Sequence, residues 1–220
     1  QTLNLGSNEL STLPSEIGNL YNLERFVLYN NQLDALPSEI GNLKNLKYLD
    51  VNNNGIFSLP DELCQLNNLI ELDASYNIFG SIPNDMNQMH NLKILNLNKN
   101  FLKTIPQCIY QLHTLQSLYV NGNQLEEIHP DIQNLQNLIN LDLFDNYIKT
   151  IPTELGNLHN LSFLDLSSNS LVIIPTEIGQ LFNLHELDLS QNMITTIDMS
   201  FELLHNLHTL DLSNNLLTSI

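Results

Sequence analysis

Seven histidines are the residues in this sequence that most readily suggest chemistry, because an imidazole can bind a metal ion or carry a proton near neutral pH. His90 and His113 lie 23 residues apart, and so do His185 and His208. His205 lies three residues before His208. Neither pair has a third ligand at a fixed spacing, as a zinc site would need. We therefore expect no metal site and no cofactor. Ordinary exposed polar residues are the favoured interpretation, and a pH-dependent contact is the alternative.

Aspartates also recur, at the same spacing as the histidine pairs. The acidic strip consists of Asp142, Asp165, Asp188 and Asp211, preceded by Asp50 and Asp73. Like charges about 5 Å apart repel by roughly 1 kcal/mol in water, so something must offset the repulsion. One interpretation is a docking strip for a basic partner, or a weak divalent-cation site. The favoured one is that each carboxylate is solvated or hydrogen-bonded to a nearby serine (Ser167, Ser190 or Ser213).

Catalytic motifs do not occur in the sequence. It contains no G-x-x-x-x-G-K-[ST] phosphate loop, no H-E-x-x-H metal motif and no nucleophile elbow. The serines, histidines and aspartates fall in recurring columns that a repeated fold explains. We therefore expect a protein that is not an enzyme, with no catalytic residue.

The repeated element that positions these columns is marked by asparagine. The ladder asparagines recur with a constant period of 23 and are Asn8, Asn31, Asn54, Asn77, Asn100, Asn123, Asn146, Asn169, Asn192 and Asn215. A fixed period carried through the chain predicts a solenoid, in which coils of one period each stack on one another, and not a globule with a closed core. One coil alone buries too little apolar surface to fold.

The residues around each ladder asparagine predict one strand per coil. The third coil contains Leu46, Leu49, Val51, Ile56 and Leu59, and the pattern is L-x-x-L-x-L-x-x-N-x-L-x-x-L-P-x-x-I-x-x-L. The L-x-L segment alternates inward and outward, so strands of successive coils should pair in parallel. The chain then turns, and the asparagine carboxamide should be buried there, donating and accepting hydrogen bonds from backbone groups that have no ladder partner.

Two further features predict the rest of the coil. A second polar column follows the ladder asparagines at a constant offset, as Asn22 follows Asn8, and Thr114 is its one exception. Segments such as Pro14–Gly18 predict one short helical turn on the opposite side, with proline at its start and glycine where the turn closes. The sixth coil shifts its proline to Pro130 and the ninth has Asp198 instead, so we expect these two coils to be irregular.

These motifs carry a resemblance to leucine-rich-repeat proteins across essentially all 220 residues. The I/L-P-x-E-I-G-x-L-x-N-L form most resembles the intracellular Ras-group members, the repeat region of fungal adenylate cyclases, and bacterial proteins with the same unit. The resemblance implies an α/β solenoid, a curved horseshoe with a parallel sheet on the concave face and short helical or 3-10 turns on the convex face. It also implies protein–protein recognition as the usual role.

Composition is consistent with one domain over residues 1–220, about ten coils with both ends uncapped, and we expect a fragment of a longer chain. The net charge of −17 disfavours nucleic acids and anionic membrane surfaces, which attract clustered lysine and arginine. No apolar run is long enough to span a membrane. We expect a protein partner, and a basic one is compatible with this charge; the sequence does not specify an oligomeric state.

Cysteine usage bears on the compartment. Cys64 and Cys108 lie two coils apart, about 10 Å at strand spacing and beyond disulfide reach. We expect two free thiols that fill gaps, with a reactive role as the alternative. The sequon at Asn160 uses a residue of the second polar column and is interpreted as structural. The chain is expected to be cytoplasmic, with a surface or secreted location as the alternative.

Partner-binding candidates are strand residues that should face outward on the concave side, at positions where other coils have Asp, Ser or Asn. The candidates are Arg25, Val27, Tyr29, Tyr48, Tyr76, Ile94, Tyr119, Phe144 and Phe163. Exposed aromatic residues and arginine contribute nothing to stacking, yet they dominate binding energy at interfaces. We favour a partner contact for each cluster over packing of the aromatics across strands.

Three classes of function follow. The leading one is a non-catalytic interaction module or scaffold that binds a partner protein on its concave face. The second is the regulatory repeat segment of a larger signalling enzyme, such as a cyclase, kinase or ubiquitin ligase. The third is a secreted or surface ligand sensor or adhesin, which the cysteine pattern disfavours.

Overall fold

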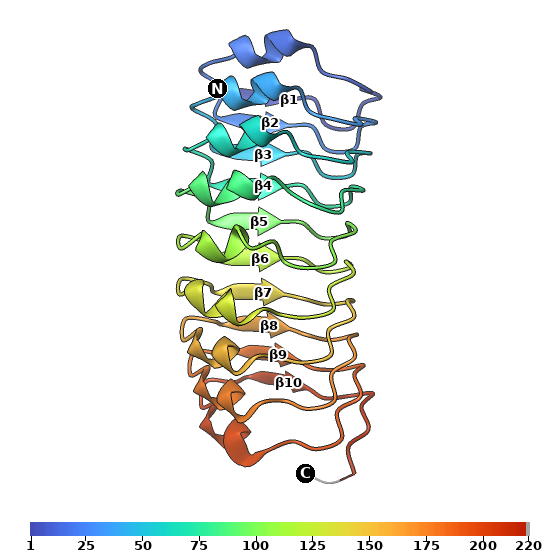
Figure 1. Cartoon of the computed structure of the whole chain (residues 1–220), viewed down its shortest axis with the longest axis vertical. Helices are drawn as coiled ribbons and strands as arrows, with labels where there is room; N and C mark the ends of the chain where they lie inside the picture. The colour runs from blue at the N-terminus through green and yellow to red at the C-terminus, as the bar shows by residue number, and fades with distance from the viewer. Residues whose placement is uncertain (219–220) are drawn as a thin grey trace. The chain divides into compact units, whose positions relative to one another are not determined.

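The computed structural model describes residues 1–218 and divides into two compact units. Unit 1 comprises residues 1–102 and 106–115, and unit 2 comprises residues 103–105 and 116–220. Both units are built from the same coil: a three-residue strand, a turn at the ladder asparagine, an extended segment, a 3-10 turn and a return to the next strand (Figure 1).

Unit 1 contains five parallel strands that pair in chain order, with equivalent residues of successive coils in register. They are β1 (Thr2–Asn4), β2 (Arg25–Val27), β3 (Tyr48–Asp50), β4 (Glu71–Asp73) and β5 (Ile94–Asn96). The 3-10 turns of the same unit are η1 (Ser15–Asn19), η2 (Ser38–Asn42), η3 (Asp61–Gln65), η4 (Asn84–Gln88) and η5 (Ile109–Gln111).

Unit 2 repeats this arrangement within the residues that are described. Its strands are β6 (Ser117–Tyr119), β7 (Asn140–Asp142), β8 (Phe163–Asp165), β9 (Glu186–Asp188) and β10 (Thr209–Asp211). Its turns are η6 (Pro130–Asn134), η7 (Thr153–Asn157), η8 (Thr176–Gln180) and η9 (Met199–Leu203). The predicted solenoid with a parallel sheet and short 3-10 turns is confirmed.

The core lies between the strands and the 3-10 turns. The central residue of each inner strand, such as Phe26, Leu49 or Leu141, is fully buried. Ile40 and Leu63 from the 3-10 turns are fully buried as well. Apolar burial therefore holds each coil against its neighbours, as the L-x-L and I-x-x-L positions predicted.

The ladder asparagines stabilise the turn that follows each strand. Nδ2 of Asn77 donates to the carbonyl oxygens of Ala74 (3.2 Å) and Ser75 (3.1 Å) in its own coil and of Val51 (3.0 Å) in the preceding coil. Its Oδ1 accepts the N–H of Ile56 at 3.0 Å. The predicted donor-and-acceptor role is confirmed. Asn100 departs from the pattern, because its buried Oδ1 has no hydrogen-bond partner.

A feature not predicted from the sequence is the left-handed residue that precedes every ladder asparagine. All ten such residues have φ between 50° and 59°, and Gly122 is the one glycine among them. Tyr76 adopts this conformation although its side chain is bulky and aromatic. The αL residue reverses the chain so that the next carboxamide can turn inward.

The second polar column also joins neighbouring coils. Nδ2 of Asn45 donates to the carbonyl of Tyr21 at 2.7 Å, and Nδ2 of Asn68 donates to that of Lys44 at 2.8 Å. Thr114 keeps this function, since its Oγ1 donates to the carbonyl of His90 at 3.0 Å.

The expectation of irregular sixth and ninth coils is wrong. Turns η6 and η9 have the same five-residue length as most others, and a side-chain cap occupies the position that proline takes in most other coils. Nδ1 of His129 accepts the N–H of Asp131 at 3.1 Å, and Oδ1 of Asp198 accepts the N–H of Ser200 at 2.8 Å. The fifth coil has the shortened turn, η5, of three residues.

The role predicted for the turn glycines also needs correction. Gly41 does not have a positive φ, so no left-handed closure requires it. A Cβ at Gly41 would lie 2.5 Å from the carbonyl oxygen of Glu62 in the next coil. Glycine is therefore present because the backbones of adjacent coils approach closely.

Candidate functional site

The sheet face is defined here as the strand and turn residues that point away from the core. In unit 1 its centre is the pair Arg25 and Tyr48, which β2 and β3 place opposite each other in register. The Arg25 guanidinium lies 3.4 Å from the centroid of the Tyr48 ring. This cation–π contact restricts the positions of both side chains.

Carboxylates surround this pair. The Tyr48 hydroxyl donates to Oδ2 of Asp50 at 3.3 Å, and Oδ1 of Asp50 accepts the Asn52 N–H at 3.1 Å. Burial raises the pKa of Asp50, and burial likewise raises the pKa of Glu71. Burial, reinforced by the Asp50 charge, raises the pKa of Tyr48 to about 12. The phenol therefore remains a neutral hydrogen-bond donor.

Tyr29 and Val27 behave differently from each other. The Tyr29 ring leans over Gly6 of the preceding coil, where an added Cβ would lie 2.6 Å from its Cε1. Tyr29 is half-buried, whereas Val27 is only 4% exposed. The expectation that Val27 presents apolar surface to a partner is wrong, because neighbouring side chains cover it on the closely spaced strands.

The remaining candidates of unit 1 are Ile94 and Tyr76, which lie at opposite ends of the strands in their respective coils. Ile94 begins β5 in register with Glu71 and is half-buried. Tyr76 occupies the left-handed turn position and is 57% exposed. Together with Arg25, Tyr29 and Tyr48, these residues are the partner-binding candidates of unit 1 that are exposed or half-buried.

In unit 2, Tyr119, Phe144 and Phe163 are all half-buried. Tyr119 lies in register with Asp142, and Phe163 lies between Asn140 and Glu186 on the neighbouring strands. Each of these two rings therefore has acidic or amide neighbours. Tyr119, Phe144 and Phe163 thus belong to three successive coils of unit 2.

Each aspartate of the acidic strip caps the turn after its strand. Oδ1 of Asp142, Asp165, Asp188 and Asp211 accepts the backbone N–H two residues later, at 2.8–3.1 Å. Oδ1 of Asp165 also accepts the Ser167 hydroxyl at 2.6 Å. Burial raises the pKa of Asp165, whereas the Ser213 hydroxyl lowers the pKa of Asp211. Each of these four carboxylates is therefore hydrogen-bonded, mainly to a backbone amide and less to the serine hydroxyl that the sequence suggested.

The histidines His185 and His208 of successive coils are stacked. Their rings are 5.3 Å apart between centroids and nearly parallel, at 7°. Nδ1 of each lies 2.7 Å from a backbone carbonyl oxygen two residues earlier, Asn183 O and Asn206 O. Within residues 1–218 there is no group of three or more His, Cys, Asp or Glu residues placed to hold a metal ion.

Cys64 and Cys108 are both buried free thiols, as predicted. Burial, together with the charges of Asp85 and Asp61, raises the pKa of Cys64 to about 12. Burial also raises the pKa of Cys108, whose Sγ lies 3.6 Å from the carbonyl oxygen of Pro83.

The thiols should therefore be unreactive in the folded chain, since the thiolate is the reactive form. Titration with a thiol-specific chromogenic reagent near neutral pH should label them at least about 100-fold more slowly than in denaturant. Two thiols per chain should be counted after unfolding. Rapid labelling of the native chain, or a lower final count, would contradict this assignment.

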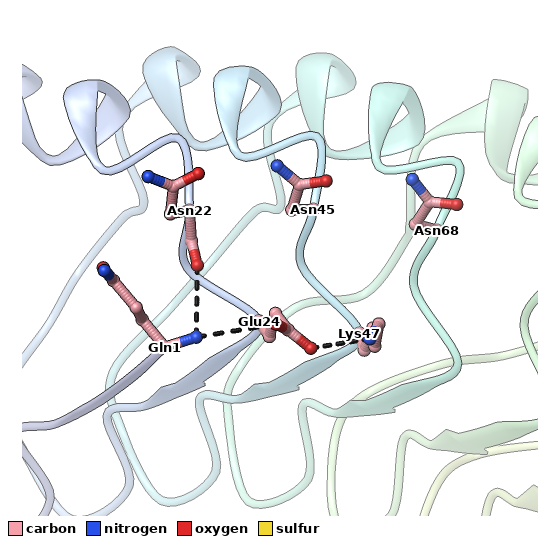
Figure 2. A pocket seen from close by; sticks show the side chains of 6 residues that line it. All are labelled: Gln1, Asn22, Glu24, Asn45, Lys47 and Asn68. Atoms are coloured by element: carbon pink, nitrogen blue, oxygen red, sulfur yellow. Dashed lines mark hydrogen bonds and ion pairs between the residues drawn. The ribbon is translucent and has the colours of Figure 1, made fainter.

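A polar recess lies in unit 1 at the edge where coils return to the strands (Figure 2). Its lining residues are Gln1, Asn22, Glu24, Asn45, Lys47 and Asn68. Nζ of Lys47 donates to Oε2 of Glu24 at 2.6 Å, and this hydrogen bond lowers the pKa of Glu24. Because Asn45 and Asn68 already donate to the preceding coils, the recess is explained by stacking.

Sequence reasoning missed the apolar side chains just beyond the ladder asparagines. We define the post-ladder edge as positions one, three and four after each ladder asparagine. In unit 1, Phe57, Ile78 and Phe101 are exposed there by 59%, 51% and 50%. In unit 2 the exposed apolar residues at these positions are Tyr147, Val172, Ile173, Met193 and Leu216. The sequence held one signal for this edge: other coils have polar residues at the same positions, such as Ser11, Gln32 and Thr104, so the apolar residues are departures from the repeat.

Within the described part of the chain, no helix is long and apolar enough to cross a bilayer.

Comparison with known families and structures identifies the repeat. A family model described as "Leucine-rich repeat region" matches residues 2–96. A model of "Leucine Rich repeats (2 copies)" matches residues 182–220, and single "Leucine Rich Repeat" models match residues 114–135, 137–158 and 160–181. No curated protein matches the chain.

Solved structures give the same result. A leucine-rich-repeat protein of Leptospira interrogans is 37% identical with a TM-score of 0.65, and the alignment covers 98% of this chain and 67% of that one. A plant peptide hormone receptor, RGFR1, solved in complex with RGF2, is 31% identical with a TM-score of 0.80, over 99% and 40% of the two chains. The functional domain of InlJ from Listeria monocytogenes is 26% identical with a TM-score of 0.80, over 95% and 43%.

Proposed function

Since the chain belongs to the leucine-rich-repeat family, we propose that it is a non-catalytic protein-interaction module whose partner binds the sheet face. The observation that carries the proposal is the Arg25–Tyr48 pair, fixed at 3.4 Å on outward-facing strand positions that stacking leaves free to vary. Arg and Tyr are the residue types that most often dominate binding energy, above all when they are already ordered.

The comparisons support a polypeptide partner. The receptor RGFR1 was solved in complex with RGF2, and the chain spans 40% of that receptor's length. The carboxylates around Tyr48 and along the acidic strip favour a partner that is basic. The proposal includes a reducing, cytoplasmic compartment, which two buried free thiols support.

Affinity capture with two double variants and one single variant tests this proposal. Tyr29→Ala/Tyr48→Ala removes two aromatic side chains from the sheet face of unit 1, and Tyr119→Ala/Phe144→Ala removes two from that of unit 2. The matched control is Tyr21→Ala, because Tyr21 is 60% exposed but lies beside a 3-10 turn.

We expect at least one double variant to bind the captured partner about tenfold more weakly, equivalent to about 1.4 kcal/mol. The Tyr21→Ala control should bind as the wild type does. Circular dichroism and thermal melts must show that the variants remain folded. If both folded double variants capture the same proteins with the same affinity, the sheet face is not the binding surface.

A further inference from the structure

A groove on the post-ladder edge of unit 2 lies outside the sheet face. Its volume is about 500 Å³, and it is lined by Lys149, Thr150, Ser170, Val172, Ile173 and Met193. Ile173 is 69% exposed and Met193 is 44% exposed. Three apolar side chains thus line a hollow open to solvent.

Stacking does not require these apolar residues. The positions equivalent to Ile173 hold Thr12, Ser58, Thr104 and Thr150 in other coils. The fold is maintained in those coils with polar side chains at the same place. A contiguous apolar hollow with a polar rim is typical of a surface that another molecule covers.

Charge indicates what kind of molecule fits. Unit 2 carries two lysines against thirteen acidic residues, a net charge of −11 out of −17 for the chain. Both lysines, Lys103 and Lys149, lie at the post-ladder edge, where Nζ of Lys149 is 3.4 Å from Oε2 of Glu126. The sheet face of unit 2 therefore has aspartates but no lysine or arginine among its described residues.

The groove and the acidic strip belong to the same coils. Asp165 precedes Ser170, Val172 and Ile173 within one coil, and Asp188 precedes Met193 in the next. A bound segment that crosses the turn would contact carboxylates on one side and the apolar hollow on the other.

We propose that the groove receives a bulky aliphatic or aromatic side chain of a basic polypeptide segment, whose lysine or arginine side chains lie against Asp165 and Asp188. This inference deepens the proposed function and rests on it, because the acidic strip is part of the sheet face. A second copy of the chain is disfavoured as the occupant, since two units of net charge −11 repel each other.

Selection from a displayed library of random peptides on the full 220-residue chain tests the inference. The enriched peptides are synthesised, and their affinities are measured by fluorescence anisotropy. The groove variant is Ile173→Ser/Met193→Ser, which preserves charge. The strip variant is Asp165→Asn/Asp188→Asn. Asparagine should keep the turn, because Asn96 occupies the same position in its own coil and its Oδ1 accepts the N–H of Asn98 at 3.1 Å. The matched control is Phe57→Ser on the post-ladder edge of unit 1.

The expected peptides combine lysine or arginine with a bulky apolar residue. They should bind about tenfold more weakly to both the groove variant and the strip variant, and as tightly to the control as to the wild type. Weakening on the strip variant alone would overturn the groove inference and leave the sheet-face proposal standing. Weakening on neither variant, no enrichment, or enriched peptides without basic residues would overturn the inference.

Analytical ultracentrifugation tests whether a second copy of the chain, and not a basic polypeptide segment, occupies the groove. The wild type and the groove variant should both sediment as monomers. A dimer of the wild type that the groove variant abolishes would assign the groove to a second copy and overturn the inference.

Discussion

Replacement of Asn77 by alanine is expected to destabilise the chain by about 3 kcal/mol, because it leaves one buried N–H without a partner, at about 1–3 kcal/mol, and removes three further hydrogen bonds, at about 0.5–1.5 kcal/mol each. Asn77 is only 4% exposed, and its carboxamide donates to three carbonyl oxygens and accepts one N–H. Alanine would leave the buried Ile56 N–H without its acceptor and would remove one of two donors from each carbonyl oxygen. The carbonyl oxygens of Val51, Ala74 and Ser75 would keep their bonds from Asn54 Nδ2, Asn100 Nδ2 and the Asn53 N–H. Urea denaturation followed by circular dichroism gives the free energy, and hydrogen exchange should show the loss of protection at the Ile56 amide.

The first ladder residue provides the matched control. Asn8 is exposed and donates only to the carbonyls of Leu5 and Gly6, at 3.0 and 3.2 Å. Asn8→Ala should therefore cost less than about 1 kcal/mol, since water can replace both bonds. Equal effects of the two substitutions would show that the buried hydrogen bonds of Asn77 do not stabilise the stack.

Gly41→Ala is expected to destabilise the chain by about 2–3 kcal/mol, typical of overpacking between rigid elements. The new Cβ would lie 2.5 Å from the carbonyl oxygen and 2.9 Å from the Cβ of Glu62. Since backbone atoms of the next coil cannot move aside cheaply, the two coils must separate. Thermal and urea unfolding measure the loss.

Gly55→Ala is the control for this clash. The nearest atom to a Cβ at Gly55 is the carbonyl oxygen of Leu33 at 3.5 Å, an ordinary contact. This substitution should be neutral or slightly stabilising, because alanine restricts the unfolded chain. Cys64 occupies in its own coil the position of Gly41, so a column in the sequence does not by itself define the clash. A Gly41→Ala chain as stable as Gly55→Ala would refute the close-approach explanation.

The constant period predicted much of the fold, because every coil must offer the same surfaces to both neighbours. Strand positions, parallel register and the carboxamide bonds of Asn77 all follow from it. Hydrogen-bonding equivalents such as His129 and Asp198 were missed, since a side-chain cap can replace proline in a turn. The left-handed residue was missed because Tyr76 or Asn53 can adopt it when the stack holds them there.

The candidate site was predicted less completely. Alternation along a strand indicates which side a residue faces but not how neighbouring strands cover it, so Val27 was expected to be exposed and is buried. The post-ladder edge has no periodic pattern of its own. Ile173 and Met193 form one apolar surface only because stacking places their two coils side by side.

The hydrogen bonds of the ladder carboxamides run in one direction along the stack, and this direction limits how the number of coils can change. The ladder side chain of an interior coil reaches backward to the coil before it, as Asn146 does in donating to the carbonyl of Val120 at 3.1 Å and accepting the N–H of Leu125 at 3.0 Å. An interior coil thus makes with the coil before it the same kind of bonds that the coil after it makes with it, although Asn100 makes only the donor half because its Oδ1 has no partner. Duplication or deletion of one whole coil would preserve this matching, whereas an insertion of any other length would interrupt it, so arrays of this kind can change length during evolution only in complete steps.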